Sequence, residues 1–175
     1  MRRSRLSAAG GALALCLFGL LGTGPAGAQD EAWIARRLPW YSLPDRTLAG
    51  SAPVSLETPP ALGACGAVSD RVDRFAAQGA VILRVEIRVE SGSVAVSLRG
   101  VDASAPLSQQ KTLTERDGDA IVYLRLEPGS GARVIALCNP GQAGVGGRAD
   151  VQSVRAARVD DLPADEAAKA NLGLL

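Results

Sequence analysis

Residues able to carry out chemistry are few in this 175-residue sequence, and histidine is absent. A serine or cysteine nucleophile is usually activated by a neighbouring base, most often an imidazole, so triads of this kind are excluded. The three cysteines are too few to make a zinc site without histidine. We therefore expect no catalytic residue, no metal, no cofactor and no enzymatic activity.

Two aspartates come closest to a catalytic pair. Asp117 and Asp119 flank Gly118, and paired carboxylates can serve glycoside hydrolysis or help to bind calcium. Asp-Gly pairs are also typical of polar turns between strands, and we favour that interpretation. The glycine-rich run 141–147 lacks a following Lys-Ser/Thr and precedes a predicted strand, so it is interpreted as a loop and not as a phosphate site.

The N-terminus has the pattern of a secretory signal. Met1–Arg5 is basic, Gly11–Leu21 is an apolar run of 11 residues, and Ala26–Ala28 supplies the small residues of a cleavage site. A membrane-spanning helix needs about 20 apolar residues, and this run is shorter. The sequence therefore predicts cleavage between Ala28 and Gln29, and a mature protein in the periplasm or outside the cell with no membrane span.

The charge balance excludes a further class of partner. The full chain carries 19 basic and 18 acidic residues. The predicted signal contains three of the arginines, so the mature chain is faintly acidic. A nucleic-acid-binding protein needs a basic face that neutralises phosphates. We expect no nucleic acid among the partners.

Two cysteines, Cys65 and Cys138, remain after the predicted cleavage. An even number of cysteines in an oxidising compartment indicates a disulfide. The alternative is a pair of buried free thiols, which behave as small apolar side chains. A redox pair is not favoured, because the sequence has no CxxC motif. We predict one disulfide between the two cysteines.

Aromatic side chains cluster near the predicted mature N-terminus, where Trp33, Trp40 and Tyr41 lie within nine residues. Flat apolar rings can stack on a sugar ring, and Trp40 and Tyr41 are our candidates for such a platform. The alternative is that these rings bury apolar area by covering an open end of the fold. Asp102 and Ser104 lie in a predicted loop, where a sandwich keeps a binding site. They are the remaining candidates for ligand binding.

Positioning these residues requires a β-fold. Over residues 81–90, apolar residues alternate with arginine and glutamate. A period of two predicts a long strand with one face in a core and the other in water. The alternation resumes at Val94 after a Ser-Gly-Ser turn. We therefore predict that the two strands pair as a β-hairpin.

Other short strands follow the same spacing. The segment 133–138 is almost wholly apolar, as expected of a central strand buried on both sides. About seven strands separated by Gly, Pro and Asp turns predict an all-β, antiparallel two-sheet sandwich. Besides the hairpin, strands are predicted over residues 53–58, 64–72, 111–115, 120–126, 133–138 and 151–159.

These patterns divide the chain into four predicted segments. They are a signal peptide over 1–28, an extended N-terminal arm over 29–52, a β-sandwich domain over 53–160 and a C-terminal tail over 161–175. The tail contains the Ala-rich run Asp165–Leu172, which begins after a proline and has acidic residues near its start. These features favour a short helix.

The predicted sandwich also resembles a known family. The residues that carry the resemblance are Val54-Ser-Leu-Glu-Thr-Pro-Pro, the hairpin Val89-Glu-Ser-Gly-Ser-Val-Ala-Val-Ser-Leu, Leu137-Cys-Asn-Pro-Gly and Ser153-Val-Arg-Ala-Ala-Arg-Val. Together they look like jelly-roll, galactose-binding-like β-sandwich domains, which are found beside bacterial glycosyltransferases and methyltransferases. The resemblance implies a jelly-roll-like fold and a carbohydrate-binding role without catalysis.

Two functions are consistent with these observations. The first is an exported, non-catalytic module that binds a glycan, with Trp40, Tyr41, Asp102 and Ser104 as candidate contacts. The alternative is a structural or adaptor protein that holds another envelope protein through a sheet edge or the N-terminal arm.

Overall fold

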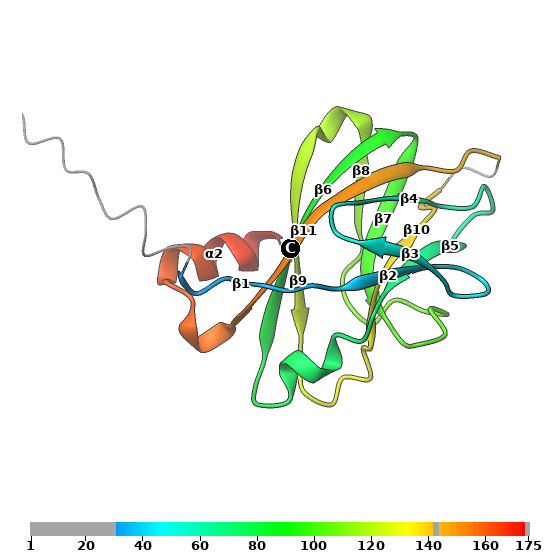
Figure 1. Ribbon diagram of the computed structural model, residues 1–175. Helices are drawn as coiled ribbons and strands as arrows, with labels where there is room; N and C mark the ends of the chain where they lie inside the picture. Colours follow the sequence, from blue (N-terminus) through cyan, green and yellow to red (C-terminus); the bar gives the residue numbers. More distant parts are fainter. Residues whose placement is uncertain (1–30, 142–143, 174–175) are drawn as a thin grey trace, which may run out of the picture.

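Two antiparallel β-sheets packed face to face form the body of the protein (Figure 1). The computed structural model describes residues 31–141 and 144–173. The five-stranded sheet contains β1 (Ile34–Ala35), β4 (Val54–Glu57), β6 (Val81–Ser91), β9 (Asp119–Leu126) and β11 (Arg148–Arg158). The six-stranded sheet contains β2 (Pro39–Ser42), β3 (Thr47–Ser51), β5 (Cys65–Ser69), β7 (Ser93–Arg99), β8 (Lys111–Thr114) and β10 (Val134–Cys138).

The predicted all-β, two-sheet class is confirmed. In the five-stranded sheet the order is β1-β11-β6-β9, and β4 also pairs with β11. In the six-stranded sheet the order is β3-β2-β5-β10-β7-β8. Short 3-10 turns η1 (Asp73–Ala76), η2 (Glu115–Asp117) and η3 (Val159–Asp161) and one helix, α2 (Ala164–Gly173), complete the described chain. The predicted signal peptide lies outside the described residues.

The core between the sheets follows the predicted alternation. In β6 the apolar residues of the period-two pattern are buried, whereas Arg88 and Glu90 are exposed. The facing sheet contributes Val94, Val96 and Leu98 of β7, which are buried in the same core. Burying such a side chain contributes about 1.5–3 kcal/mol relative to leaving it in water. The two strands therefore supply much of the apolar contact between the layers.

The predicted hairpin of β6 and β7 does not form. β6 pairs with β11 and β9, whereas β7 pairs with β10 and β8 in the other sheet. Either arrangement buries alternate residues, so the alternation alone cannot distinguish a hairpin from a corner between two sheets. Gly92 forms that corner with a φ of 69°, and a Cβ there would lie 2.7 Å from the backbone oxygen of Gly146. Glycine is therefore required at this turn.

The segment predicted as an extended arm is part of both sheets. β1 pairs with β11, and β2 pairs with both β3 and β5. Pairing satisfies the backbone groups of this segment, and burial of Trp40 holds it against the core. The strands are only two to five residues long, and a register shift after Trp40 interrupts them. A clear period of two was therefore missing from the sequence.

The C-terminal helix predicted over Asp165–Leu172 is confirmed as α2. It packs on the outer face of the five-stranded sheet, where Ala170 contributes to a cluster with Trp33, Ile82 and Ala157. Asp165 and Glu166 occupy its first turn, where acidic side chains complement the helix dipole. Within residues 31–141 and 144–173, no helix has the length and apolarity needed to cross a membrane.

Candidate functional site

The predicted disulfide is present. Cys65 of β5 and Cys138 of β10 are joined with an S–S distance of 2.03 Å. They occupy facing positions on neighbouring strands of the six-stranded sheet. The two cysteines are separated by 73 residues in the sequence, so the bond closes a long loop of the chain. It therefore ties the early part of the chain to the central strand of the sheet.

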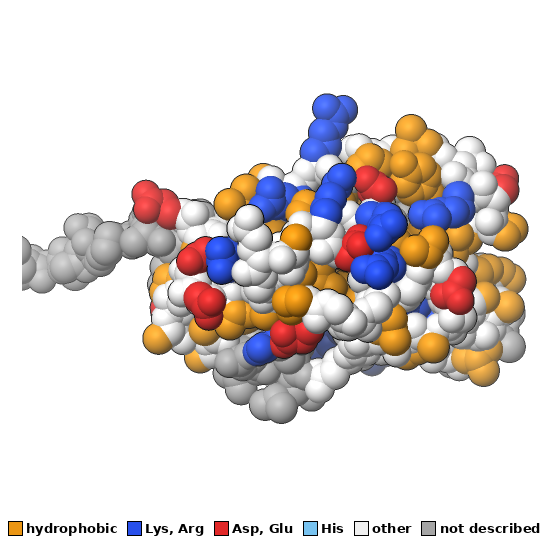
Figure 2. Space-filling view, turned by 90° about the horizontal axis from the view of Figure 1, so that it is seen from below, with side chains coloured by type: hydrophobic (Ala, Val, Ile, Leu, Met, Phe, Trp, Pro, Cys, Tyr) orange, Lys and Arg blue, Asp and Glu red, His pale blue; other side chains and the backbone are white. Residues whose placement is uncertain are grey.

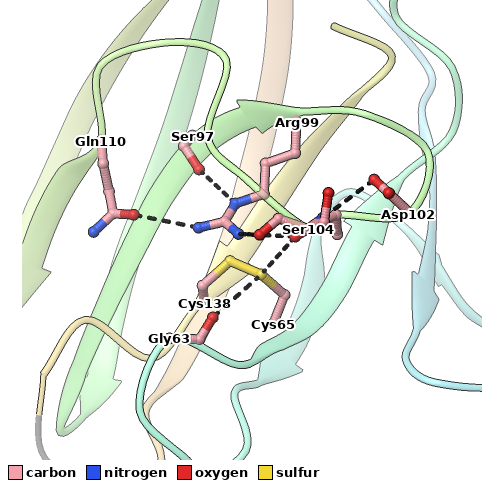
Figure 3. The surroundings of a disulfide bond; sticks show 9 residues. Gly63, Cys65, Ser97, Arg99, Asp102, Ser104, Gln110 and Cys138 are labelled. Carbon is pink, nitrogen blue, oxygen red and sulfur yellow. Dashed lines mark hydrogen bonds between the residues drawn. A yellow bond between two sulfur atoms is a disulfide. The ribbon is translucent and has the colours of Figure 1, made fainter.

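Arg99, the last residue of β7, lies near this disulfide on the outer face of the sheet (Figure 3). It is 5% exposed, and no carboxylate of the described residues lies within 4.0 Å of it. Its guanidinium donates to four neutral oxygens, namely Ser97 Oγ (3.2 Å), Ala103 O (2.8 Å), Ser104 O (3.3 Å) and Gln110 Oε1 (3.4 Å). Burial lowers the pKa of Arg99. The side chain fastens the β7–β8 loop, residues 100–110, to the sheet.

Asp102 and Ser104, two of the predicted ligand contacts, lie in the β7–β8 loop. The Ser104 backbone N–H donates to Asp102 Oδ1 at 3.2 Å, and this bond holds the pKa of Asp102 below its usual range. Ala103 between them has a left-handed φ of 55° and packs its side chain onto the sheet. Asp102 also lines an open cavity of about 400 Å³ beside Cys65. Both residues are exposed, and their contacts are those of a polar turn.

Trp40 and Tyr41 point to opposite faces of the six-stranded sheet. Trp40 is 0% exposed and belongs to the core between the sheets, so it cannot stack on a ligand. Tyr41 is half-buried on the outer face, where it packs against a buried cluster that includes Val68 and Ala136. Adjacent residues of a strand point in opposite directions, which is why the two rings separate. The prediction that Trp40 and Tyr41 form one aromatic platform is therefore wrong.

Trp33 has a third environment. Its side chain is buried under α2 with its ring centroid 6.0 Å from that of Tyr123. The aromatic cluster seen in the sequence is thus distributed over the core, the outer face of one sheet and the outer face of the other. Both tryptophans bury apolar area, but Trp40 does so in the core between the sheets and Trp33 does so under α2.

The carboxylate pair Asp117 and Asp119 is engaged in local structure. Asp117 Oδ2 accepts hydrogen bonds from the backbone N–H of Thr114 at 2.7 Å and from its hydroxyl at 2.9 Å. These bonds lower the pKa of Asp117 and cap η2. Asp119 pairs with Arg88 at 3.2 Å. This agrees with the turn interpretation. Within the described residues, no group of three Cys, Asp or Glu side chains could hold a metal ion.

A groove that sequence reasoning missed lies between β1, η1 and the end of β11. We call it the arginine groove; its volume is about 320 Å³, and its polar and aromatic lining consists of Arg36, Arg74, Phe75, Gln78, Arg158 and Asp161. Ile34, Val81 and Ala156 add apolar wall. Figure 2 views the molecule from the side on which η1 lies and shows basic side chains next to apolar ones.

The guanidinium of Arg36 has unused hydrogen-bonding capacity. It lies 4.8 Å from the ring centroid of Phe75, but its Nε is buried without a hydrogen-bond partner. No carboxylate among the described residues lies within 4.0 Å of it. A cation–π contact of this kind orients the group without neutralising its charge. The Arg36 guanidinium is therefore already oriented, and it can donate hydrogen bonds to an anionic ligand.

Arg158 and Arg74 complete the basic lining of the groove. Arg158 Nη2 donates to the backbone oxygen of Gln78 at 3.2 Å, and no described carboxylate pairs with it. Arg74 lies 5.2 Å from the Phe75 centroid and pairs with Asp70 at 3.4 Å. Two of the three guanidinium groups thus lack a counter-ion among the residues that the structure describes. The arrangement can bind a small anionic group through charge-assisted hydrogen bonds.

Nothing in the sequence marked these arginines as a set. They come from three segments far apart in the chain, and each stands in an unremarkable local pattern. Only the pairing of β1 with β11 and the placement of η1 at the same end of the sandwich bring them together.

Comparisons with known proteins add little to this description. No protein-family model matches the chain, and no curated protein matches it significantly. Among solved structures, PRD1 vertex protein P5 is similar, with 14% sequence identity and a TM-score of 0.27, over 73% of this chain and 86% of that chain. A likeness this distant says nothing about function. The fold itself defines the class, which is an antiparallel β-sandwich with one disulfide between neighbouring strands.

Proposed function

We propose that the protein is an exported, non-catalytic β-sandwich module that binds an acidic glycan in the arginine groove. The observation that carries the proposal is the presence in one cavity of two guanidinium groups, Arg36 and Arg158, that have no carboxylate partner within residues 31–141 and 144–173. The site differs from the aromatic platform expected from the sequence, because Trp40 is enclosed in the core.

The chemistry of the groove favours an anion. The Arg36 side chain makes no hydrogen bond with a described residue, and a hydrogen bond between a charged guanidinium and a ligand oxygen contributes about 1.5–3 kcal/mol. The planar guanidinium matches the two oxygens of a carboxylate better than any other cationic side chain. Asp161 is the only acidic residue among the described residues that line the groove, whereas three arginines line it, so the described lining carries net positive charge.

The size and the remaining lining favour a sugar bearing that anion. A volume of about 320 Å³ lies at the lower end of small-molecule sites. The exposed Ile34 side chain in the aliphatic wall can contact the apolar face of a pyranose, while Gln78 and Asp161 offer oxygens to hydroxyl groups. The resemblance to galactose-binding-like domains also supports a glycan. A uronic-acid residue combines the required carboxylate with these features.

Calorimetric titration tests the proposal. We expect trigalacturonate to bind and the neutral trisaccharide galactotriose to bind far more weakly. Arg36→Gln and Arg158→Gln should each weaken trigalacturonate binding by about tenfold or more, because a hydrogen bond to a charged group contributes about 1.5–3 kcal/mol. Arg37→Gln is the matched control, since Arg37 is exposed next to the groove and does not line it.

Two results would reject the proposed site. One is the absence of binding to a panel of acidic oligosaccharides. The other is undiminished binding by the double variant of Arg36 and Arg158. Export is tested separately, because mass spectrometry of the protein from the envelope fraction should report an N-terminus at Gln29.

A further inference from the structure

The edge strand β9 presents a free hydrogen-bonding edge. It pairs with β6 along its whole length, from Val81↔Leu126 to Arg88↔Asp119, without a register shift. On its other side, no backbone hydrogen bond from a described residue reaches residues 119–126. Alternate N–H and C=O groups of β9 therefore point away from the sheet and are available to another strand.

This edge lacks several of the features that usually prevent pairing between molecules. Residues 119–126 contain no proline, glycine or lysine. β9 has eight residues and is longer than the other outer strands of the described sheets. Of these, β3 has five residues, β4 and β8 have four, and β1 has two. Long, regular edge strands without such protection associate readily.

The outer face of β9 is complementary to itself. Its outward residues are Asp119, Ile121, Tyr123 and Arg125, and Ile121 is 45% exposed. If two copies pair antiparallel about a two-fold axis at Val122, Asp119 of each copy faces Arg125 of the other. In the same register Ile121 faces Tyr123. Opposite charges and apolar–aromatic pairs at facing positions both stabilise antiparallel strands.

We propose that β9 is a homodimerisation edge, at which two copies of the chain join their five-stranded sheets into one continuous sheet with Val122 at the two-fold axis. This surface is independent of the arginine groove, which lies at β1 and β11 on the other side of the same sheet. An isologous strand pair repeats each contact twice, so every complementary pair counts double.

Neither the present ion pairs nor α2 prevents this association. Asp119 pairs with Arg88, and Arg125 pairs with Glu127, but these side chains are 42–72% exposed. Ion pairs at such sites contribute little and can exchange partners. α2 covers the outer face at Tyr123, where the ring is half-buried, and leaves Ile121 exposed.

Sedimentation velocity of the protein, expressed from the 175-residue sequence with its disulfide formed, tests the edge. The mass should rise from one chain towards two between about 1 µM and 1 mM, the range in which small interfaces associate. Asp119→Lys and Arg125→Glu place like charges opposite each other, and each should raise the dissociation constant by about tenfold. The double variant D119K/R125E should restore the dimer.

The double variant separates the dimer from effects within one chain. It breaks both intrachain ion pairs and would be the most perturbed protein if those pairs mattered, whereas the proposed register predicts recovery. Lys111→Glu, on the exposed edge strand β8 of the other sheet, should leave the dissociation constant unchanged. A chain that stays monomeric at 1 mM (about the upper limit of weak association), or a dimer that the single charge reversals do not weaken, would overturn the proposal.

Discussion

Arg99 and Arg36 both lack a carboxylate partner among the described residues, but their surroundings differ in kind. Arg99 is 5% exposed and donates to four neutral oxygens, two of which are backbone carbonyls of the β7–β8 loop. Arg36 is half-buried over Phe75, and its Nε has no acceptor. The first guanidinium has most of its donors in use, whereas the second has donors to spare.

The difference separates a structural arginine from a binding arginine. A buried cation is tolerated when neutral acceptors replace the lost water, and removing it leaves those acceptors unsatisfied. A cation with free donors at the wall of a groove contributes little to the fold and can instead meet a ligand. The region around the disulfide and Arg99 should therefore respond in stability, and the arginine groove should respond in binding.

The largest effect is expected at the disulfide beside Arg99. Replacing both cysteines, C65A/C138A, should lower the free energy of unfolding by about 4 kcal/mol, because the bond closes a loop with a sequence separation of 73 residues. Urea unfolding of the variant and of the oxidised wild type gives this difference. A loss below about 1 kcal/mol would mean that the bond constrains the unfolded chain far less than the entropy argument requires.

The second effect compares one substitution at the two arginines. Arg99→Gln should lower the free energy of unfolding by about 2–3 kcal/mol, because the carbonyls of Ala103 and Ser104 lose their donors in a buried place. Arg36→Gln should change it by less than about 0.5 kcal/mol. Thermal and urea unfolding measure both. Equal losses at the two positions would remove the distinction between them.

The third effect is the reverse comparison in binding. Arg99→Gln should leave the affinity for trigalacturonate within about twofold of wild type at a temperature where the variant is folded, whereas Arg36→Gln should weaken it by about tenfold. Titration calorimetry, with circular dichroism to verify folding, provides the measurement. Loss of affinity in Arg99→Gln alone would move the binding site to the β7–β8 loop.

The smallest effect concerns an arginine cluster that does have a carboxylate. Asp73 accepts hydrogen bonds from Arg71 and from Arg133, the latter at 2.8 Å, and chiefly its bond with Arg71 lowers the pKa of Asp73. A carboxyl whose pKa is lower in the folded state adds stability above its unfolded pKa. That stability is lost as the pH falls below about 4 and approaches the folded pKa. Unfolding curves from pH 6 to pH 2 should show a shallower decline in Asp73→Asn; an identical decline would contradict this.

The regular strands were predictable because their burial is periodic along the chain. The alternation over residues 81–90 predicted β6 and which of its residues lie in the core, and both are confirmed. The almost wholly apolar segment 133–138 predicted a central strand, and β10 (Val134–Cys138) lies between β5 and β7 with every residue buried. In each case one local property, the side chain's affinity for water, decides the outcome.

Pairing partners were harder to predict. The turn at Gly92 was interpreted as a hairpin, but it joins strands of different sheets. The segment containing Trp40 was interpreted as an arm, but it supplies strands to both sheets. Local patterns report which side of a strand faces apolar surroundings and carry no information about which strand lies beside it.

The candidate site was harder still to predict from the sequence. The cysteine pair could be predicted because an even count in an oxidising compartment leaves few choices. The arginine groove could not, because Arg36, Arg74 and Arg158 are ordinary polar residues in their own segments. The lack of a described counter-ion at Arg36 and Arg158 is a property of the assembled surface and appears only when the distances are known.

By itself the sequence determined the all-β class, the inward face of the long strands, the cysteine pairing and the C-terminal helix, because each depends on residue type and spacing within the chain. Tertiary structure decided that Trp40 is enclosed while Tyr41 faces outward, and that three distant arginines share one groove. It also decided that β9 is left at an edge. The physical reason is that charge neutralisation, cavity shape and edge exposure depend on neighbours brought together by folding, and no single segment contains them.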